Sequence, residues 1–148
     1  MKKQLFGIFG LLSLASIAMF SCSKSSSSTS STATKDNMVG TWIITSTASD
    51  NNGNGVKDAT EIVTSDTSWA HQLSTFNANG TFADNYYNFA IHGNWELLNN
   101  NTWVKITVTD TGVNYGLTGY SQILSISSTE LSIKDTSGGV SWTTYRKQ

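Results

Sequence analysis

The stretch T-W-V-K-I-T-V-T, Thr102 to Thr109, alternates apolar and polar side chains with a period of two. Val104, Ile106 and Val108 fall on one face, and the residues between them fall on the other. Successive side chains of a β-strand point to opposite faces, so this alternation predicts a strand with one buried face and one solvated face.

Seven further segments have the same strand character and alternate with short links rich in Asn, Gly and Ser. They are rich in β-branched and aromatic residues, and the 148-residue chain contains no proline. Links of this length join antiparallel neighbours as hairpins. The seven expected strands are Val39–Ala48, Trp69–Phe76, Thr81–Phe89, Asn94–Leu98, Tyr120–Ser127, Leu131–Asp135 and Val140–Arg146.

Eight strands connected by hairpins predict an all-β fold, a single up-and-down antiparallel barrel. Closing the sheet removes the free strand edges that otherwise invite aggregation. A β-sandwich is the alternative, because it has the same spacing of short strands and turns. The stretch 38–148 provides about 110 residues, enough for one domain and not for two.

The N-terminus has the pattern of an export signal. Lys2 and Lys3 precede an uncharged, mostly apolar run of sixteen residues, Leu5 to Phe20. A membrane-spanning helix needs about 20 residues, so a cleaved signal peptide over residues 1–21 is the better interpretation. Ser21 and Cys22 resemble the end of a bacterial lipobox, and Cys22 is the only cysteine. We therefore expect a lipoprotein whose Cys22 carries acyl chains (palmitate); an ordinary signal peptide beside an unrelated cysteine is the alternative.

Residues 22–37 form a Ser/Thr-rich segment, which we expect to be a tether between the lipidated cysteine and the barrel domain at 38–148. Such a protein would contact the membrane through Cys22 and reside in the cell envelope, at the outer membrane, with its periplasmic or surface face undetermined. Without Lys2 and Lys3 the chain has seven Lys and Arg against ten Asp and Glu. The absence of a basic stripe argues against nucleic acid as a partner.

Four short motifs in order resemble the lipocalin-like lipoproteins of Bacteroidota. They are Gly40-Thr41-Trp42, the hairpin 75–82, Gly93-Asn94-Trp95-Glu96 and the segment 124–133. The resemblance implies a small lipid-anchored β-barrel in which Trp42, following Gly40, plugs the closed end. It also implies that a C-terminal arginine stacks across this tryptophan, and Arg146 is the residue in that place.

The segment D-N-N-G-N-G-V-K-D-A-T-E, Asp50 to Glu61, matches the calcium-loop pattern D-x-[DN]-x-[DN]-G-x₅-E at every defined position. Its flanks look like strand ends and not helices, so we expect an EF-hand-like loop inserted in the sheet. Few carboxylates and an internal lysine predict weak affinity, about 10⁻⁴ to 10⁻³ M. A solvated Asn/Gly turn without metal is the alternative. The expected Ca²⁺ ligands are Asp50, Asn52, Asn54, Val56 (by its carbonyl), Asp58 and Glu61.

Two functions remain open for a chain of this kind. The first is a monomeric protein that binds a small hydrophobic ligand inside its barrel. The second is a structural or interaction protein with a filled barrel, which contacts a protein or glycan through loops such as 112–120. For the first, the residues expected to line the ligand site are Trp69, Phe82, Tyr86, Trp95 and Trp103.

Enzymatic activity is not expected. His71 and His92 are the only histidines, and neither lies in the spacing of a nucleophile elbow, a metalloprotease or a phosphate loop. Asp84 and Glu96 are the candidates for a carboxylate pair across the barrel mouth.

Overall fold

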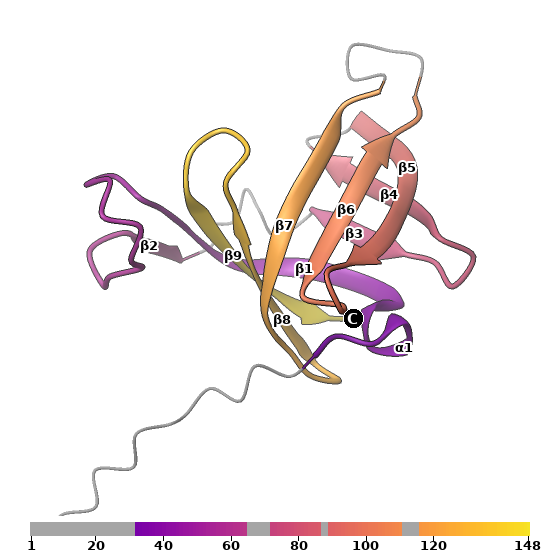
Figure 1. The fold of residues 1–148 in the computed structure, drawn as a ribbon, viewed down its shortest axis with the longest axis horizontal. Helices are drawn as coiled ribbons and strands as arrows, with labels where there is room; N and C mark the ends of the chain where they lie inside the picture. The colour runs from indigo at the N-terminus through magenta and orange to yellow at the C-terminus, as the bar shows by residue number, and fades with distance from the viewer. Residues whose placement is uncertain (1–31, 65–71, 87–88, 111–115) are drawn as a thin grey trace, which may run out of the picture.

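The computed structural model describes residues 32–64, 72–86, 89–110 and 116–148. The expected signal peptide, Cys22, Trp69 and His71 lie outside these ranges. Within them the chain forms one short helix and nine strands (Figure 1). The elements are α1 (Lys35–Met38), β1 (Gly40–Ser49), β2 (Ile62–Thr64), β3 (Leu73–Phe76), β4 (Thr81–Tyr86), β5 (Phe89–Leu98), β6 (Trp103–Val108), β7 (Thr118–Ile126), β8 (Glu130–Asp135) and β9 (Ser141–Lys147).

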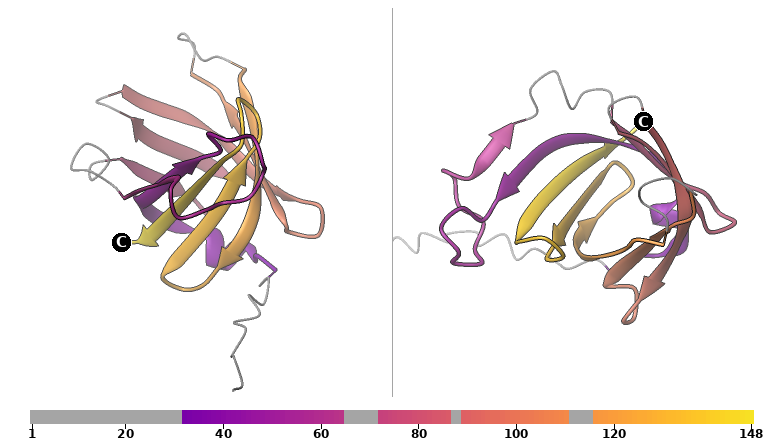
Figure 2. Two further views of the ribbon diagram at one scale, coloured as in Figure 1. Left: turned by 90° about the vertical axis from the view of Figure 1, so that its left-hand side faces the viewer. Right: turned by 90° about the horizontal axis from the view of Figure 1, so that it is seen from above.

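The sheet closes on itself as an eight-stranded antiparallel up-and-down barrel, as predicted. Strands β3 to β9 follow one another in order, and β1 pairs with both β3 and β9. The views in Figure 2 show the curved wall that this order produces. Because β1 and β9 pair over most of their length, the sheet is continuous and the β-sandwich alternative is wrong.

Strand β1 changes partner along one of its edges. Its first half, from Gly40 to Ile43, pairs with β3, whereas Ser46 to Ala48 pair with the added strand β2. The register with β9 shifts between Ile44 and Ser46, as at a β-bulge. A bulge increases local twist and redirects side chains. Beyond it β1 stays paired with β9 as far as Ser49, where the 50–61 loop begins.

Strand β5 begins at Phe89, five residues before the expected start at Asn94. The stretch Ala90 to Gly93 has weak strand propensity, but its cross-strand pairing with β4 overrides that propensity. Gly93 permits β5 and β6 to lie close together: a Cβ there would be 2.4 Å from the carbonyl oxygen of Thr107. The need for glycine at position 93 becomes visible only when β5 and β6 are paired in the folded structure.

One end of the barrel is closed by α1 and the buried Trp42. The Trp42 indole has no exposed surface, and its Nε1 donates a hydrogen bond to the Met38 carbonyl oxygen at 2.9 Å. The ammonium of Lys147 lies 5.0 Å from the centre of the Trp42 ring. Lys147, and not Arg146, takes the position over the tryptophan, because Lys147 pairs with Trp42 while exposed Arg146 points to the opposite face.

Aromatic side chains pack inside the barrel next to this closed end. Phe76 packs against Phe82 at 5.1 Å between ring centroids and edge-on against Trp95 at 5.5 Å. The indole Nε1 of Trp95 donates to the carbonyl oxygen of Asn77 at 3.0 Å. In the described part of the chain, no helix is long and apolar enough to span a membrane.

Candidate functional site

The barrel interior contains a cavity of about 210 Å³, the interior cavity. Side chains from β3, β4, β6, β7, β8 and β9 line it, so distant parts of the chain meet there only because the sheet closes. The apolar lining residues are Phe76, Phe82, Val104, Ile106, Leu131 and Ile133. The polar lining residues are Ser74, Asp84, Ser121, Asp135, Ser141, Thr143 and Tyr145.

The lining changes from apolar to polar along the barrel axis. On one wall, the pair Phe76 and Phe82 lies toward the α1 end, and the next inward pair is Ser74 and Asp84. The opposite wall passes from Leu131 through Ile133 to Asp135 in the same direction. The interior cavity therefore has an apolar floor near α1 and carboxylates toward the other end.

Asp84 is a partly buried carboxylate inside this wall. It accepts hydrogen bonds from the Ser74 hydroxyl at 2.5 Å and from the Gln72 amide nitrogen at 3.4 Å. Burial raises the pKa of Asp84 above its ordinary value, and these two hydrogen bonds oppose the rise. The amide oxygen of Gln72 is buried without a hydrogen-bond partner among the described residues.

Asp135 faces the same cavity from β8. Its Oδ1 accepts a hydrogen bond from the backbone N–H of Ser137 at 2.7 Å. Strands β4 and β8 are four strands apart in a ring of eight, so Asp84 and Asp135 stand on opposite walls. Burial and the nearby charges of Asp84 and Asp135 raise the pKa of Tyr145 above its ordinary range, so its phenol stays neutral.

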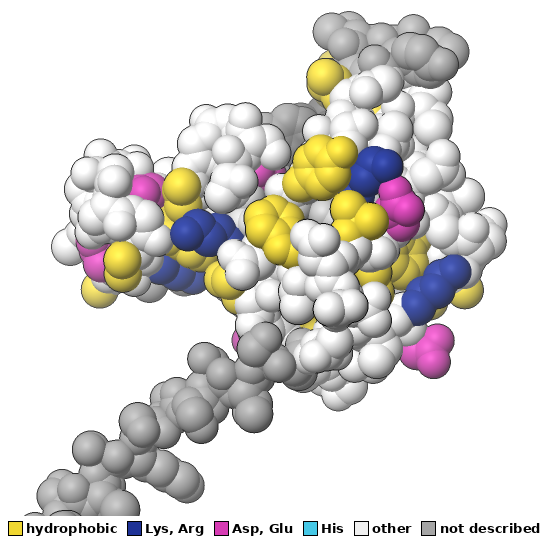
Figure 3. Space-filling model, viewed as in Figure 1, with side chains coloured by type: hydrophobic (Ala, Val, Ile, Leu, Met, Phe, Trp, Pro, Cys, Tyr) yellow, Lys and Arg dark blue, Asp and Glu magenta, His cyan; other side chains and the backbone are white. Residues whose placement is uncertain are grey.

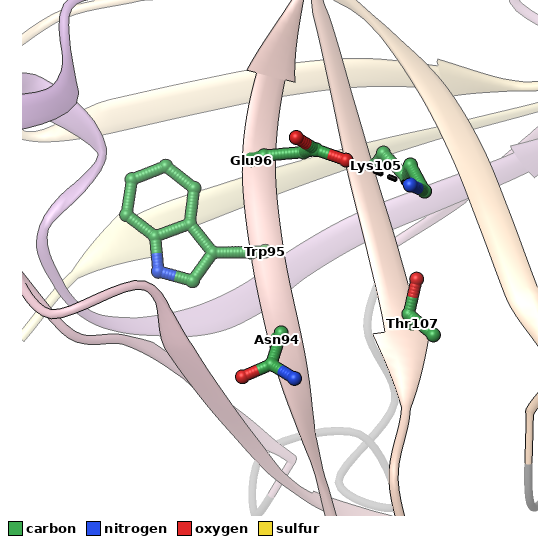
Figure 4. Close-up of a pocket in the computed structure, with 5 residues that line it drawn as sticks. All are labelled: Asn94, Trp95, Glu96, Lys105 and Thr107. Atoms are coloured by element: carbon green, nitrogen blue, oxygen red, sulfur yellow. Dashed lines mark hydrogen bonds and ion pairs between the residues drawn. The ribbon is translucent and has the colours of Figure 1, made fainter.

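The outer wall has a separate surface hollow, the outer depression, of about 330 Å³ (Figure 4). Glu96 reaches toward Lys105 across β5 and β6, and their ion pair measures 2.7 Å. Trp95 points away from this pair in Figure 4. The expected pairing of Asp84 with Glu96 is wrong, because Asp84 faces the interior cavity and Glu96 is on the outer wall.

The structure brings together only some of the aromatic residues that were expected to line one ligand site. Phe82 lines the interior cavity, and Trp95 belongs to the same core cluster, where both rings contact Phe76. Trp103 neighbours the inward-facing Val104 and therefore lies on the outer face of β6. Tyr86 ends β4, but its side chain, like Trp69, lies outside what the structure describes.

Asp135 and Tyr145 line the interior cavity although neither was expected there from the sequence. The available signal was the phase of the alternation: Asp135 continues the inward positions Leu131 and Ile133, and Tyr145 falls in step with Thr143. A carboxylate in phase with buried apolar positions indicates an inward-facing charge.

The 50–61 loop folds around its own oxygens. Asp50 accepts hydrogen bonds from the backbone N–H groups of Asn54 and Gly55 at 3.0 and 2.8 Å. Glu61 is only 3% exposed and accepts from the backbone N–H groups of Asn51 and Asp58 at 3.2 and 3.3 Å. Gly55 has a φ of +71°, a value suited to glycine.

This loop is attached to the outside of the barrel. Lys134 of β8 donates to the Gly55 carbonyl oxygen at 3.2 Å, and its ammonium lies 5.5 Å from the centre of the Trp142 ring. The backbone N–H of Asp50 also donates to the Val140 carbonyl oxygen at 2.9 Å. Across the described ranges, no three His, Cys, Asp or Glu side chains come together in a metal-binding group.

The fold and the interior cavity define a small closed β-barrel of a kind that can enclose a ligand. No family model and no curated protein matches the chain. Among solved structures, LTBP1 in a complex with LTC4 matches at a TM-score of 0.51 and 11% identity, over 80% of this chain and 72% of that one. A DUF4847 family protein from Bacteroides vulgatus ATCC 8482 matches at 0.50 and 16% identity, over 76% of this chain and 96% of that one. At these identities the likeness establishes the shared fold alone.

Proposed function

We propose that this chain is a lipid-anchored envelope lipoprotein whose barrel binds a small hydrophobic ligand in its interior cavity. The supporting observation is an interior space of about 210 Å³ above an apolar floor, in a barrel whose α1 end is closed. Pockets for drug-sized molecules measure about 300–1,000 Å³. The ligand should therefore be smaller than a typical drug molecule.

Filling the cavity tests this function. Thr143 lines the interior cavity and its neighbour Thr144 does not, so Thr143→Phe and Thr144→Phe add the same side chain inside and outside the barrel. Native mass spectrometry of the purified full chain should show a co-purified small molecule in the wild type and in Thr144→Phe. Thr143→Phe should lose that mass. A bare chain mass in all three proteins would contradict the binding function.

The anchoring part of the proposal depends on the N-terminal sequence. The apolar run before Cys22 and the polar tether after it support acylation of Cys22 and attachment to the outer membrane. The full chain should partition into the membrane fraction with the mass of a diacylated N-terminal cysteine, whereas Cys22→Ser should not. An unmodified Cys22 in the membrane fraction would contradict lipidation.

A second candidate is a monomeric structural or interaction lipoprotein that uses its outer surface. Phe89, Leu117 and Tyr120 are 72%, 59% and 44% exposed, which favours contact with a protein or glycan. Figure 3 shows hydrophobic side chains gathered on the face that carries β6 and β7. If this candidate is right, Phe89→Ser with Leu117→Ser should abolish pull-down of an envelope partner while Thr143→Phe has no effect. Neither candidate involves catalysis.

We also propose weak calcium binding by the 50–61 loop. The Asp50 and Glu61 carboxylates support it, since both turn toward the loop and accept hydrogen bonds from its backbone N–H groups. An EF-hand-like loop uses carboxylates at these two positions as ligands. Native mass spectra at millimolar calcium should gain one ion, and Glu61→Gln should lose it. Glu130→Gln, an exposed carboxylate at the start of β8, is the control. Equal calcium uptake by all three proteins would contradict the assignment.

A further inference from the structure

The polar end of the interior cavity has negative charge without a matching cation. Asp84 and Asp135 are its two carboxylic acids, and no Lys, Arg or His is among the described residues that line it. In the described part of the chain, neither carboxylate takes part in an ion pair. Asp84 is partly buried, and a carboxylate there is costly unless it is paired. This end of the cavity therefore favours a positively charged guest.

At this end of the cavity, a hydrogen-bond acceptor that the described residues leave unsatisfied also favours a positively charged guest. The buried amide oxygen of Gln72, next to Asp84, is an acceptor without a donor among the described residues. Tyr145 also lines the cavity; its backbone lies opposite Leu131 of β8, nearer the apolar floor, and the charges of Asp84 and Asp135 act on its phenol. A guest with several N–H donors would satisfy the Gln72 amide oxygen and the two carboxylates, whereas a carboxylate guest would offer them no donor.

The arrangement fits an organic cation better than a metal ion. Asp84 and Asp135 stand on opposite walls, and the described residues contain no cluster of three acidic, His or Cys side chains. Calcium takes about six to eight oxygens, and transition metals prefer His and Cys ligands. The apolar floor of Phe76, Phe82 and Leu131 instead offers room for a hydrocarbon body.

We infer that the ligand of the interior cavity is a small organic ammonium. Its apolar body rests on Phe76, Phe82 and Leu131, and its protonated nitrogen lies between Asp84 and Asp135. This inference rests on the proposed binding function and specifies the chemical class of its ligand.

Matched probes test it on the full chain in detergent by isothermal titration calorimetry. Two apolar bodies, phenylethyl and hexyl, each carry an amine, an alcohol or a carboxylate. The amine should bind about 10-fold or more tighter than the alcohol with the same body, and the carboxylate should not bind. Hydrogen bonds to charged groups contribute about 1.5–3 kcal/mol, so Asp84→Asn should weaken amine binding about 10- to 100-fold and change alcohol binding less than about twofold.

Two further variants complete the design. Asp135→Asn should weaken amine binding in the same way, which covers the case that Asp84→Asn does not fold. Glu96→Gln removes an acid from the outer wall and should leave all affinities unchanged. Equal binding of amine and alcohol, or full amine affinity in both Asp variants, would overturn the inference and leave the binding function standing. No binding of any probe would overturn both.

Discussion

Gly93→Ala should destabilise the barrel strongly, although it adds one methyl group. Its Cβ would lie 2.4 Å from the Thr107 carbonyl oxygen, 3.1 Å from the Thr107 carbonyl carbon and 3.3 Å from Val108 Cα. All three atoms belong to backbone, so no rotamer change relieves the clash. An ordinary contact begins near 3.4 Å, and β5 and β6 must therefore separate by about 1 Å.

The cost follows from that separation. The neighbouring hydrogen bond from Thr109 N–H to the His92 carbonyl oxygen measures 2.9 Å and would stretch beyond bonding distance. Losing one or two such bonds costs about 1 kcal/mol each, and overpacking adds about 1–3 kcal/mol. Replacing a glycine in a strand by alanine stabilises the folded state by about 0.5–1 kcal/mol, which offsets part of this cost. The free energy of unfolding should fall by about 3 kcal/mol, which lowers the melting temperature by roughly 10–20 °C.

Gly119→Ala is the matched control, because nothing lies within 4 Å of a Cβ built at Gly119, on the next strand pair. Thermal melts followed by circular dichroism should place Gly119→Ala within about 0.5 kcal/mol of the wild type. If Gly93→Ala melts with the wild type, or if both variants lose the same stability, the close approach of β5 and β6 at Gly93 is not real.

Three further predictions concern single side chains. Burial raises the folded-state pKa of Asp84 above its ordinary value of 3.8. The free energy of unfolding should therefore fall as the pH rises from 3.8 through the raised pKa. Asp84→Asn should remove this fall, so the variant should melt at a higher temperature than the wild type at pH 7, by a margin that shrinks toward pH 3. Lys147→Met should lower the free energy of unfolding by about 0.5–1 kcal/mol, because the ammonium loses its contact with the Trp42 ring. Arg146→Met should lower it less, as measured by denaturant titration. The reverse order would mean that Arg146, and not Lys147, covers the Trp42 ring. Lys134→Met should speed amide exchange across 50–58 by releasing the Gly55 carbonyl oxygen, and unchanged exchange would show that the loop is held without it.

Local patterns were enough to predict most of the wall. The alternation from Val104 to Val108 and the Asn- and Gly-rich links depend on neighbours in sequence, and the strands they predict are present. The run Asn99-Asn100-Asn101 adopts φ values of +51°, +55° and +65°, a conformation that asparagine tolerates in turns. The early start of β5 was not predictable, because Ala90 to Gly93 become strand only through pairing with β4.

For the candidate site, too, some residues were predictable from the sequence and others were not. Phe82 was expected at a ligand site and does line the interior cavity, but Trp103 faces outward because it alternates with Val104. The pairing of Asp84 with Glu96 failed for the same reason, since the two residues lie on different faces. A shift of one position along a strand decides whether a side chain faces the cavity or the solvent.

The sequence by itself determined that this chain forms short antiparallel strands with one apolar face, because side-chain alternation and turn conformation depend on residues close together in the chain. Only the tertiary structure decided that β1 pairs with β9, that Lys147 covers Trp42, and that Asp84 and Asp135 face one cavity from opposite walls. Those outcomes depend on register and closure between segments up to about 100 residues apart, which are set by the packing of the whole barrel.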